Sequence, residues 1–98
     1  MKFNTGTILL VEDDNHQRGI IKTILTKEGF FVEDVDCGKK AIEQIKASSF
    51  DLVVTDLRLP DIDGTEVIKE VKRLDMACHV IIITAFGSIP SAIEATKL

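Results

Sequence analysis

The fold is decided by the stretch ILLVEDD at residues 8–14, in which four apolar residues are followed directly by three acidic ones. A short, continuous apolar run is typical of a strand that is covered on both faces, as in the middle of a parallel sheet. Two similar and mostly β-branched runs follow, LVV at 52–54 and VIII at 80–83. We therefore predict three central parallel strands.

Amphipathic helices are predicted between these strands, because apolar residues recur there at helical spacing. The three core-facing stripes are Ile20, Ile21, Ile24 and Leu25; Ala41, Ile42 and Ile45; and Val67, Ile68 and Val71. We expect Asn15 to cap the first helix and Gly29 to end it. Asp63, with Glu66 three residues later, resembles a capping box and predicts the start of the third helix.

Two further segments complete the predicted fold. The stretch FVEDV at 31–35 is more polar than the other strands, which predicts a second strand at the sheet edge, and residues 88–98 predict a fourth helix. The order β-α-β-α-β-α-β-α folds through right-handed crossovers into a three-layer, flavodoxin-like α/β structure with a parallel sheet of order 2-1-3-4. A crevice is expected at the carboxyl ends of the first and third strands.

Carboxylates are delivered into this crevice by both strands. Glu12 and Asp13 follow the first strand, and Asp56 closes the third. Several carboxylates lie together unfavourably unless positive charge lies among them, and oxygen-rich sites of this kind suit Mg²⁺, which also binds substrate phosphate. A metal-assisted phosphoryl site follows as a hypothesis. Asp14 is expected to be only a surface or capping residue.

The composition limits the range of functions. The 98 residues, 45% of them hydrophobic, are enough for one modest core, so we expect one domain over residues 1–98. A net charge of −4 supplies no positive field for nucleic acid, and we expect no direct nucleic-acid binding by this chain. Cys37 and Cys78 have no CxxC partner, which favours a reducing, cytoplasmic setting. No apolar run predicts a signal or membrane segment.

Three motifs resemble those of bacterial two-component response-regulator receiver domains, the CheY-like family: ILLVEDD at 8–14, DLRLPDIDG at 56–64 and ITA at 83–85. They occur in the family's order, and each lies at the carboxyl end of a predicted strand. The resemblance covers almost the entire chain. It implies a phosphoacceptor signalling domain rather than an enzyme, which receives a phosphoryl group from a sensor histidine kinase with Mg²⁺ and passes a conformational change to an output module outside this chain.

The resemblance also implies roles for individual residues. Asp56 is the residue that accepts the phosphoryl group. Asp13 and Asp56 bind Mg²⁺ through their side chains, Glu12 acts mainly through a metal-bound water, and the backbone carbonyl of Arg58 completes the protein ligands. Thr84 is similar to the family's switch residue, whose hydroxyl bonds to a phosphoryl oxygen once the aspartate is modified.

Receiver domains continue past the fourth helix with a fifth strand, a lysine at its end and a fifth helix, none of which is predicted within residues 1–98. We therefore expect an incomplete receiver domain, shortened from a longer regulator. The open, apolar edge of the strand at 80–83 favours homodimers or swapped oligomers. The segment IPSAIEA at 89–95 resembles NtrC-type transcription activators, so the expected output is transcription control.

Two other functional classes remain open on the residues alone. A metal-binding interaction module would bind Mg²⁺ without being phosphorylated. A Mg²⁺-dependent phosphatase would use Asp56 as nucleophile, but many such enzymes place a carboxylate two residues later as general acid, where this chain has Arg58. Measurement of Mg²⁺ binding, of stable phosphorylation and of turnover of a phosphate ester separates the three.

Overall fold

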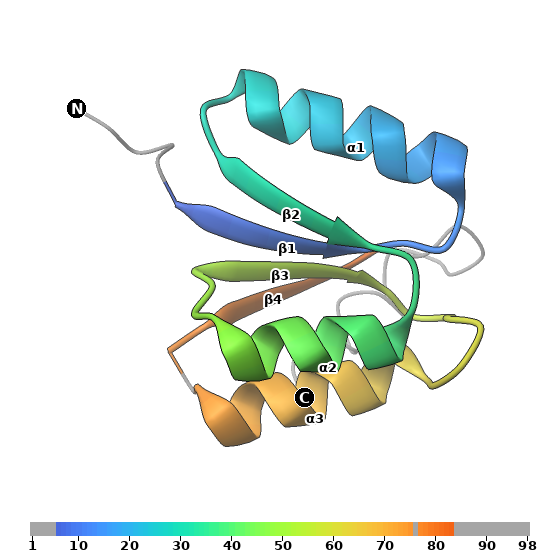
Figure 1. The fold of residues 1–98 in the computed structure, drawn as a ribbon, viewed down its shortest axis with the longest axis vertical. Helices are drawn as coiled ribbons and strands as arrows, with labels where there is room; N and C mark the ends of the chain where they lie inside the picture. The colour runs from blue at the N-terminus through green and yellow to red at the C-terminus, as the bar shows by residue number, and fades with distance from the viewer. Residues whose placement is uncertain (1–5, 76, 84–98) are drawn as a thin grey trace.

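Parallel strands and the helices between them alternate along the chain in the computed structural model, which describes residues 6–75 and 77–83. The strands are β1 (Thr7–Val11), β2 (Phe31–Val35), β3 (Leu52–Asp56) and β4 (His79–Ile83), and the helices are α1 (Asn15–Lys27), α2 (Gly38–Ala47) and α3 (Gly64–Leu74). The sheet has the order β2-β1-β3-β4 (Figure 1). The predicted order and the edge position of β2 are confirmed.

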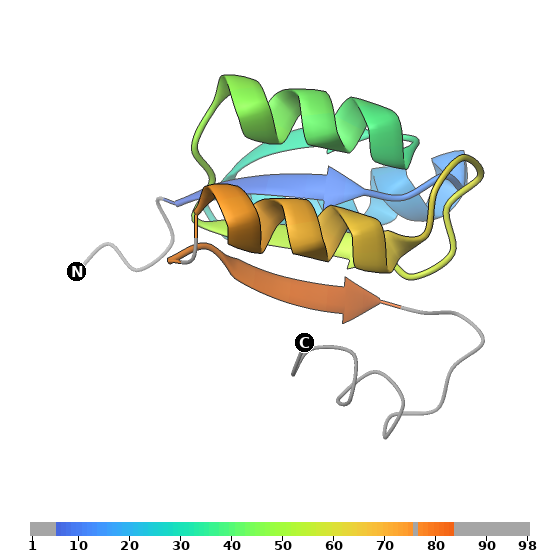
Figure 2. The same ribbon diagram turned by 90° about the horizontal axis from the view of Figure 1, so that it is seen from below.

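The helices cover both faces of the sheet. α1 lies on one face, and α2 and α3 lie side by side on the other (Figure 1, Figure 2). Neighbouring residues of β1 point to opposite faces: Ile8 and Leu10 pack beneath α1, whereas Leu9 and Val11 pack beneath α2 and α3. Because both faces of β1 and β3 are covered, their inner positions must be apolar, which explains their continuous runs in the sequence. The prediction of a central position was wrong for β4, which is the outer strand of the sheet in the described part of the chain and has Ile81 48% exposed.

The helix ends are set by side-chain and backbone hydrogen bonds. Asp14, not Asn15, caps α1, since its carboxylate accepts a hydrogen bond from the Gln17 N–H at 2.9 Å. The expectation for Asn15 was wrong by one residue. Gly29 follows the end of α1 with a φ of 99°, a conformation that a glycine adopts without strain. Asp63 caps α3, as predicted.

The apolar stripe of α1 is narrower than its sequence suggests. Ile21 and Leu25 pack against the core, but the side chains of Ile20 and Ile24 are 47% and 55% exposed. On a helix these pairs form two neighbouring rows of residues spaced by four, and only one row lies against the sheet. The corresponding stripe of α3, formed by Val67, Ile68 and Val71, is buried throughout.

Candidate metal centre

Three carboxylates converge at the carboxyl edge of the sheet. Glu12 and Asp13 directly follow β1, Asp56 is the last residue of β3, and the two strands are hydrogen-bonded neighbours with Val11 beside Thr55. One carboxylate oxygen from each of the three acidic residues lies within 4.8 Å of the others. The convergence expected from the strand order is therefore present.

Glu12 is the buried member of this cluster, with a side chain that is only 4% exposed. Burial, together with the nearby charge of Asp56 and hydrogen bonding with Asp13, raises the pKa of its carboxyl to about 7, against the opposing effect of the Asp14 N–H. Gathering three carboxylates is unfavourable unless positive charge offsets them. A set of three carboxylates, the one such group among the described residues, fits a hard divalent cation such as Mg²⁺.

Asp56 is held at the end of β3 by its neighbours. One of its carboxylate oxygens accepts a hydrogen bond from the Arg58 N–H at 3.2 Å, and the Thr55 hydroxyl donates to its main-chain carbonyl at 3.0 Å. Gly64 lies against this backbone so closely that a Cβ there would be 2.8 Å from the Leu57 Cα and closer still to the Asp56 carbonyl oxygen. The start of α3 therefore fixes the backbone that carries Asp56.

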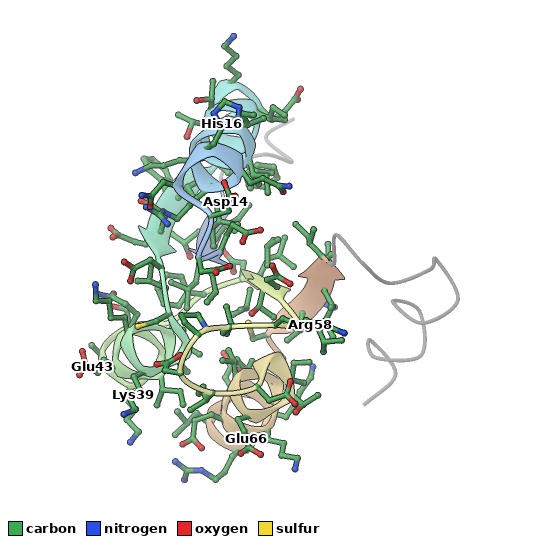
Figure 3. The ribbon with its side chains drawn as sticks, turned by 90° about the vertical axis from the view of Figure 1, so that its right-hand side faces the viewer. Asp14, His16, Lys39, Glu43, Arg58 and Glu66 are labelled. Atoms are coloured by element: carbon green, nitrogen blue, oxygen red, sulfur yellow. The ribbon has the colours of Figure 1, made fainter. Side chains whose placement is uncertain are left out.

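The loop at residues 57–63 joins Asp56 to α3. Figure 3 views the carboxyl ends of the strands and shows Arg58 on this loop, with Lys39 on the neighbouring helix α2. The loop is closed at its base by the hydrogen bond from the Gly64 N–H to the Leu57 carbonyl at 2.8 Å and by a bridge between Arg58 and Asp63. The backbone carbonyl of Arg58 thus belongs to a loop with a defined path.

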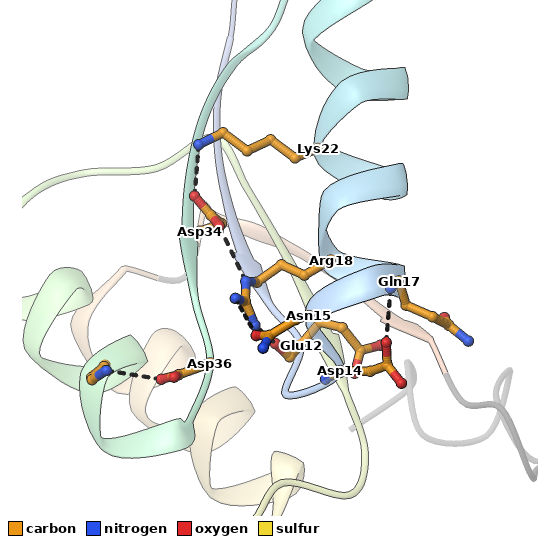
Figure 4. A network of polar contacts seen from close by, with 9 residues as sticks. Glu12, Asp14, Asn15, Gln17, Arg18, Lys22, Asp34 and Asp36 are labelled. Carbon is orange, nitrogen blue, oxygen red and sulfur yellow. Dashed lines mark hydrogen bonds and ion pairs between the residues drawn. The ribbon is translucent and has the colours of Figure 1, made fainter.

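Arg18 supports the acidic cluster from α1, and the sequence interpretation missed it. Its guanidinium donates to the main-chain carbonyl of Glu12 at 2.8 Å, to the Asn15 side chain at 2.6 Å and to the Asp34 carboxylate at 3.2 Å (Figure 4). Lys22 also pairs with Asp34, at 2.7 Å. The sequence did contain a signal for the contact with Asp34. Side chains alternate between the two faces of a strand, so Asp34 of β2 faces α1, and a carboxylate in that position requires a cation from that helix.

The remaining sequence predictions concern Thr84, a helix at 88–98, the two cysteines and membrane segments. Thr84 and the predicted helix at 88–98 lie outside the described residues. Cys37 is half-buried, Cys78 is buried, and neither forms a disulfide. Within the described part of the chain, no helix has both the length and the apolar character needed to cross a membrane.

Comparison with known proteins agrees with the family that the sequence motifs resemble. The response regulator receiver domain family matches residues 8–98. The chain is 39% identical over 90 residues to the transcriptional regulatory protein ZraR of Escherichia coli strain K12, an alignment that covers 92% of this chain and only 20% of ZraR. It is 38% identical over 91 residues to the chemotaxis protein CheY of Bacillus subtilis strain 168, which covers 92% of this chain and 76% of CheY.

Solved structures show the same likeness. The response regulator TrrA from Thermotoga maritima, in complex with Mg(2+)-BeF, superposes with a TM-score of 0.82 at 28% identity over 92% of this chain and 80% of TrrA. The beryllofluoride-activated NtrC4 receiver domain dimer superposes with a TM-score of 0.83 at 31% identity over 93% of this chain and 75% of that chain.

Proposed function

The chain belongs to the response regulator receiver domain family, and on this premise we propose that Asp56 is the residue that accepts the phosphoryl group. Receiver domains are phosphoacceptor signalling modules. The observation that supports Asp56 is its place at the end of β3, where it shares one cluster with Glu12 and Asp13. We assign residues 1–98 to one receiver unit.

The proposed reaction is a transfer to a carboxylate. An oxygen of Asp56 attacks the phosphorus of the donor, an O–P bond forms, and the bond from phosphorus to the donor's leaving group breaks. The product is an acyl phosphate on Asp56. Water then attacks the same phosphorus, which releases inorganic phosphate and restores the carboxylate, so the domain modifies and demodifies itself without acting on an external substrate as an enzyme.

The proposed Mg²⁺ ligands are the side chains of Asp13 and Asp56, the main-chain carbonyl of Arg58, and Glu12 acting through a bound water. When bound, Mg²⁺ offsets the negative charge of the carboxylates and of the transferred group. The burial and raised pKa of Glu12 support the need for such a cation. We propose Thr84 as the switch residue, whose hydroxyl donates to the phosphoryl group after transfer.

The partners are proposed from the family. The phosphoryl donor is a sensor histidine kinase, and the output is a transcription-control module, since ZraR is a transcriptional regulatory protein of which this chain matches 20%. The exposed row of Ile20 and Ile24 on α1 lines a surface pocket with Asn15 and His16 at the start of that helix and offers an apolar surface for the donor. The free thiols of Cys37 and Cys78 agree with a cytoplasmic location.

The test is phosphorylation by acetyl phosphate with Mg²⁺, followed by intact mass spectrometry. The wild type should gain the mass of one phosphoryl group, and Asp56→Asn should gain none. Asp14→Asn is the matched control, because it removes the same charge at the same edge while keeping a good helix cap. Labelling of the Asp56 variant would exclude Asp56 as acceptor.

The same experiment separates the other functional classes. Mg²⁺ binding without any phosphorylation would favour an interaction module over a phosphoacceptor. Sustained turnover of a small phosphate ester, many equivalents per protein, would indicate a phosphatase instead.

A further inference from the structure

The loop that follows Asp56 is tied to a helix that lies far from it in the sequence. The two carboxylate oxygens of Asp61 accept hydrogen bonds from the first two N–H groups of α2, those of Gly38 and Lys39, each at 2.8 Å. Cys37, the residue that precedes α2, makes no side-chain capping bond. The loop therefore supplies the cap that this helix does not obtain locally.

The electrostatics of Asp61 agree with this contact. Its limited burial would raise the pKa of its carboxyl, but the N–H groups of Lys39, Gly38 and Ile62 outweigh that effect and lower the pKa to about 2. The carboxylate is thus ionised and held at the positive end of the helix dipole. Both the geometry and the charge favour a fixed position for the loop.

A steric contact reinforces the same junction. Ile62 packs on Gly38 so closely that a Cβ at position 38 would lie 2.7 Å from the Ile62 Cδ1 and closer still to its Cγ1. A Cβ at this position would force the Ile62 side chain out of its present contact with α2. The φ of Gly38 is not positive, so its backbone conformation does not call for glycine. Glycine is required at this position because Ile62 approaches it so closely.

We propose that Asp61 is a positioning residue for the metal centre. It anchors the distal part of the loop at 57–63 to α2, while the hydrogen bond from Gly64 to Leu57 closes the base of the loop. Arg58 lies between these two points, so its main-chain carbonyl is held relative to Asp56. This inference rests on the proposed function, in which that carbonyl is a Mg²⁺ ligand.

The first test is the Mg²⁺ affinity of the full chain, measured by titration calorimetry. Asp61→Ala should weaken Mg²⁺ binding roughly tenfold, the size usual for groups that orient a metal ligand. Asp61→Asn keeps one acceptor oxygen and should lose less. In acetyl phosphate labelling, Asp61→Ala should raise the Mg²⁺ concentration needed for half-maximal rate, while the rate at saturating Mg²⁺ stays near that of the wild type.

The charge control is Asp36→Asn. Asp36 follows β2 at the same edge of the sheet and pairs with Lys40 of α2 at 3.0 Å, so its replacement removes an equal charge but leaves the loop anchor intact. It should change Mg²⁺ affinity by much less than Asp61→Ala. Equal losses in the two variants would overturn the proposal, because general electrostatics would then explain both.

A second set of variants changes the steric contact between Gly38 and Ile62 without changing any charge. Gly38→Ala should also weaken Mg²⁺ binding, and adding Ile62→Ala should restore part of the affinity because it removes the atoms that clash. In the absence of metal, amide hydrogen exchange at Gly38 and Lys39 should be faster in Asp61→Asn than in the wild type. These variants decide the question even if Asp61→Ala fails to fold.

The outcomes for the inference and for the proposed function differ. If the wild type binds no Mg²⁺, the proposed metal centre fails and the role of Asp61 fails with it. If the wild type binds Mg²⁺ and the variants Asp61→Ala, Asp61→Asn and Gly38→Ala bind it equally well, only the positioning role of Asp61 is overturned.

Discussion

The Arg18 guanidinium donates to the main-chain carbonyl of Glu12 at 2.8 Å, and this bond ties α1 to the backbone that carries the acidic cluster. The Arg18 side chain is 18% exposed, so a replacement leaves partly buried acceptors without a donor. Arg18→Ala should lower the free energy of unfolding by about 1–3 kcal/mol, measured by urea denaturation. Lys22→Ala, which removes only the more exposed pair with Asp34, should cost less than about 1 kcal/mol. If the two variants lost the same free energy of unfolding, the hydrogen bond from Arg18 to the Glu12 carbonyl would contribute nothing beyond the ion pairs with Asp34.

The pH dependence of stability should reflect Asp34. Hydrogen bonding to Lys22 lowers the pKa of this carboxyl below its ordinary value of 3.8, and Arg18 adds to the effect. Because the folded-state pKa is the lower one, the stabilisation is fully present above about pH 4 and is lost as the pH falls through the folded pKa. Asp34→Asn should flatten this part of the stability curve, measured by thermal unfolding between neutral and acid pH. If stability depended on pH equally steeply in Asp34→Asn and the wild type, Asp34 would not be the group responsible.

Neutralising Glu12 should stabilise the metal-free protein and weaken its response to metal. Glu12→Gln removes a buried carboxyl from beside Asp56 and keeps nearly the same shape. In the wild type, Mg²⁺ at a hundred times its dissociation constant should add about 2.7 kcal/mol to the unfolding free energy. The variant should have a higher Tm without Mg²⁺ and a smaller Mg²⁺-induced rise. A lower metal-free Tm with an unchanged rise would contradict the prediction.

Gly64 should not tolerate a side chain. A Cβ there would overlap the Asp56 carbonyl oxygen and lie 2.8 Å from the Leu57 Cα, both of which are backbone atoms that cannot rotate away. Gly64→Ala should destabilise the fold by about 1–3 kcal/mol, as overpacking usually does, and should reduce acetyl phosphate labelling of Asp56. Gly19→Ala is the control, since a Cβ at Gly19 meets nothing within 4 Å.

The proposed docking role of Ile20 and Ile24, the exposed row on α1, can be tested separately from phosphoryl transfer to Asp56. Ile20→Ser should change the unfolding free energy by less than about 0.5 kcal/mol, because the side chain is 47% exposed. Labelling by acetyl phosphate should remain at the wild-type rate, whereas transfer from a phosphorylated histidine kinase should slow severalfold. Equal rates from the kinase would exclude this row as the docking surface.

Much of the fold was predictable because its determinants are local. The runs at 8–11, 52–54 and 80–83 are apolar at every position, which is typical of strands covered on both faces, and crossover handedness then limits the sheet order. The same order brings Glu12 and Asp13 beside Asp56, so the gathering of the carboxylates followed from topology, whereas the roles of Arg58 and Thr84 were implied only by the family resemblance. The cap of α1 was misplaced by one residue, since Asp14 and Asn15 are both good capping residues and only the backbone decides between them.

The sequence by itself determined the elements, the sheet order and the gathering of the three carboxylates, because period, strand order and motif are properties of the chain. Only the tertiary structure decided that Arg18 reaches the Glu12 carbonyl, that Asp61 caps a helix 23 residues away, and that burial raises the pKa of Glu12. These features depend on how side chains from separate elements approach one another, so no single segment of the sequence specifies the distances between them.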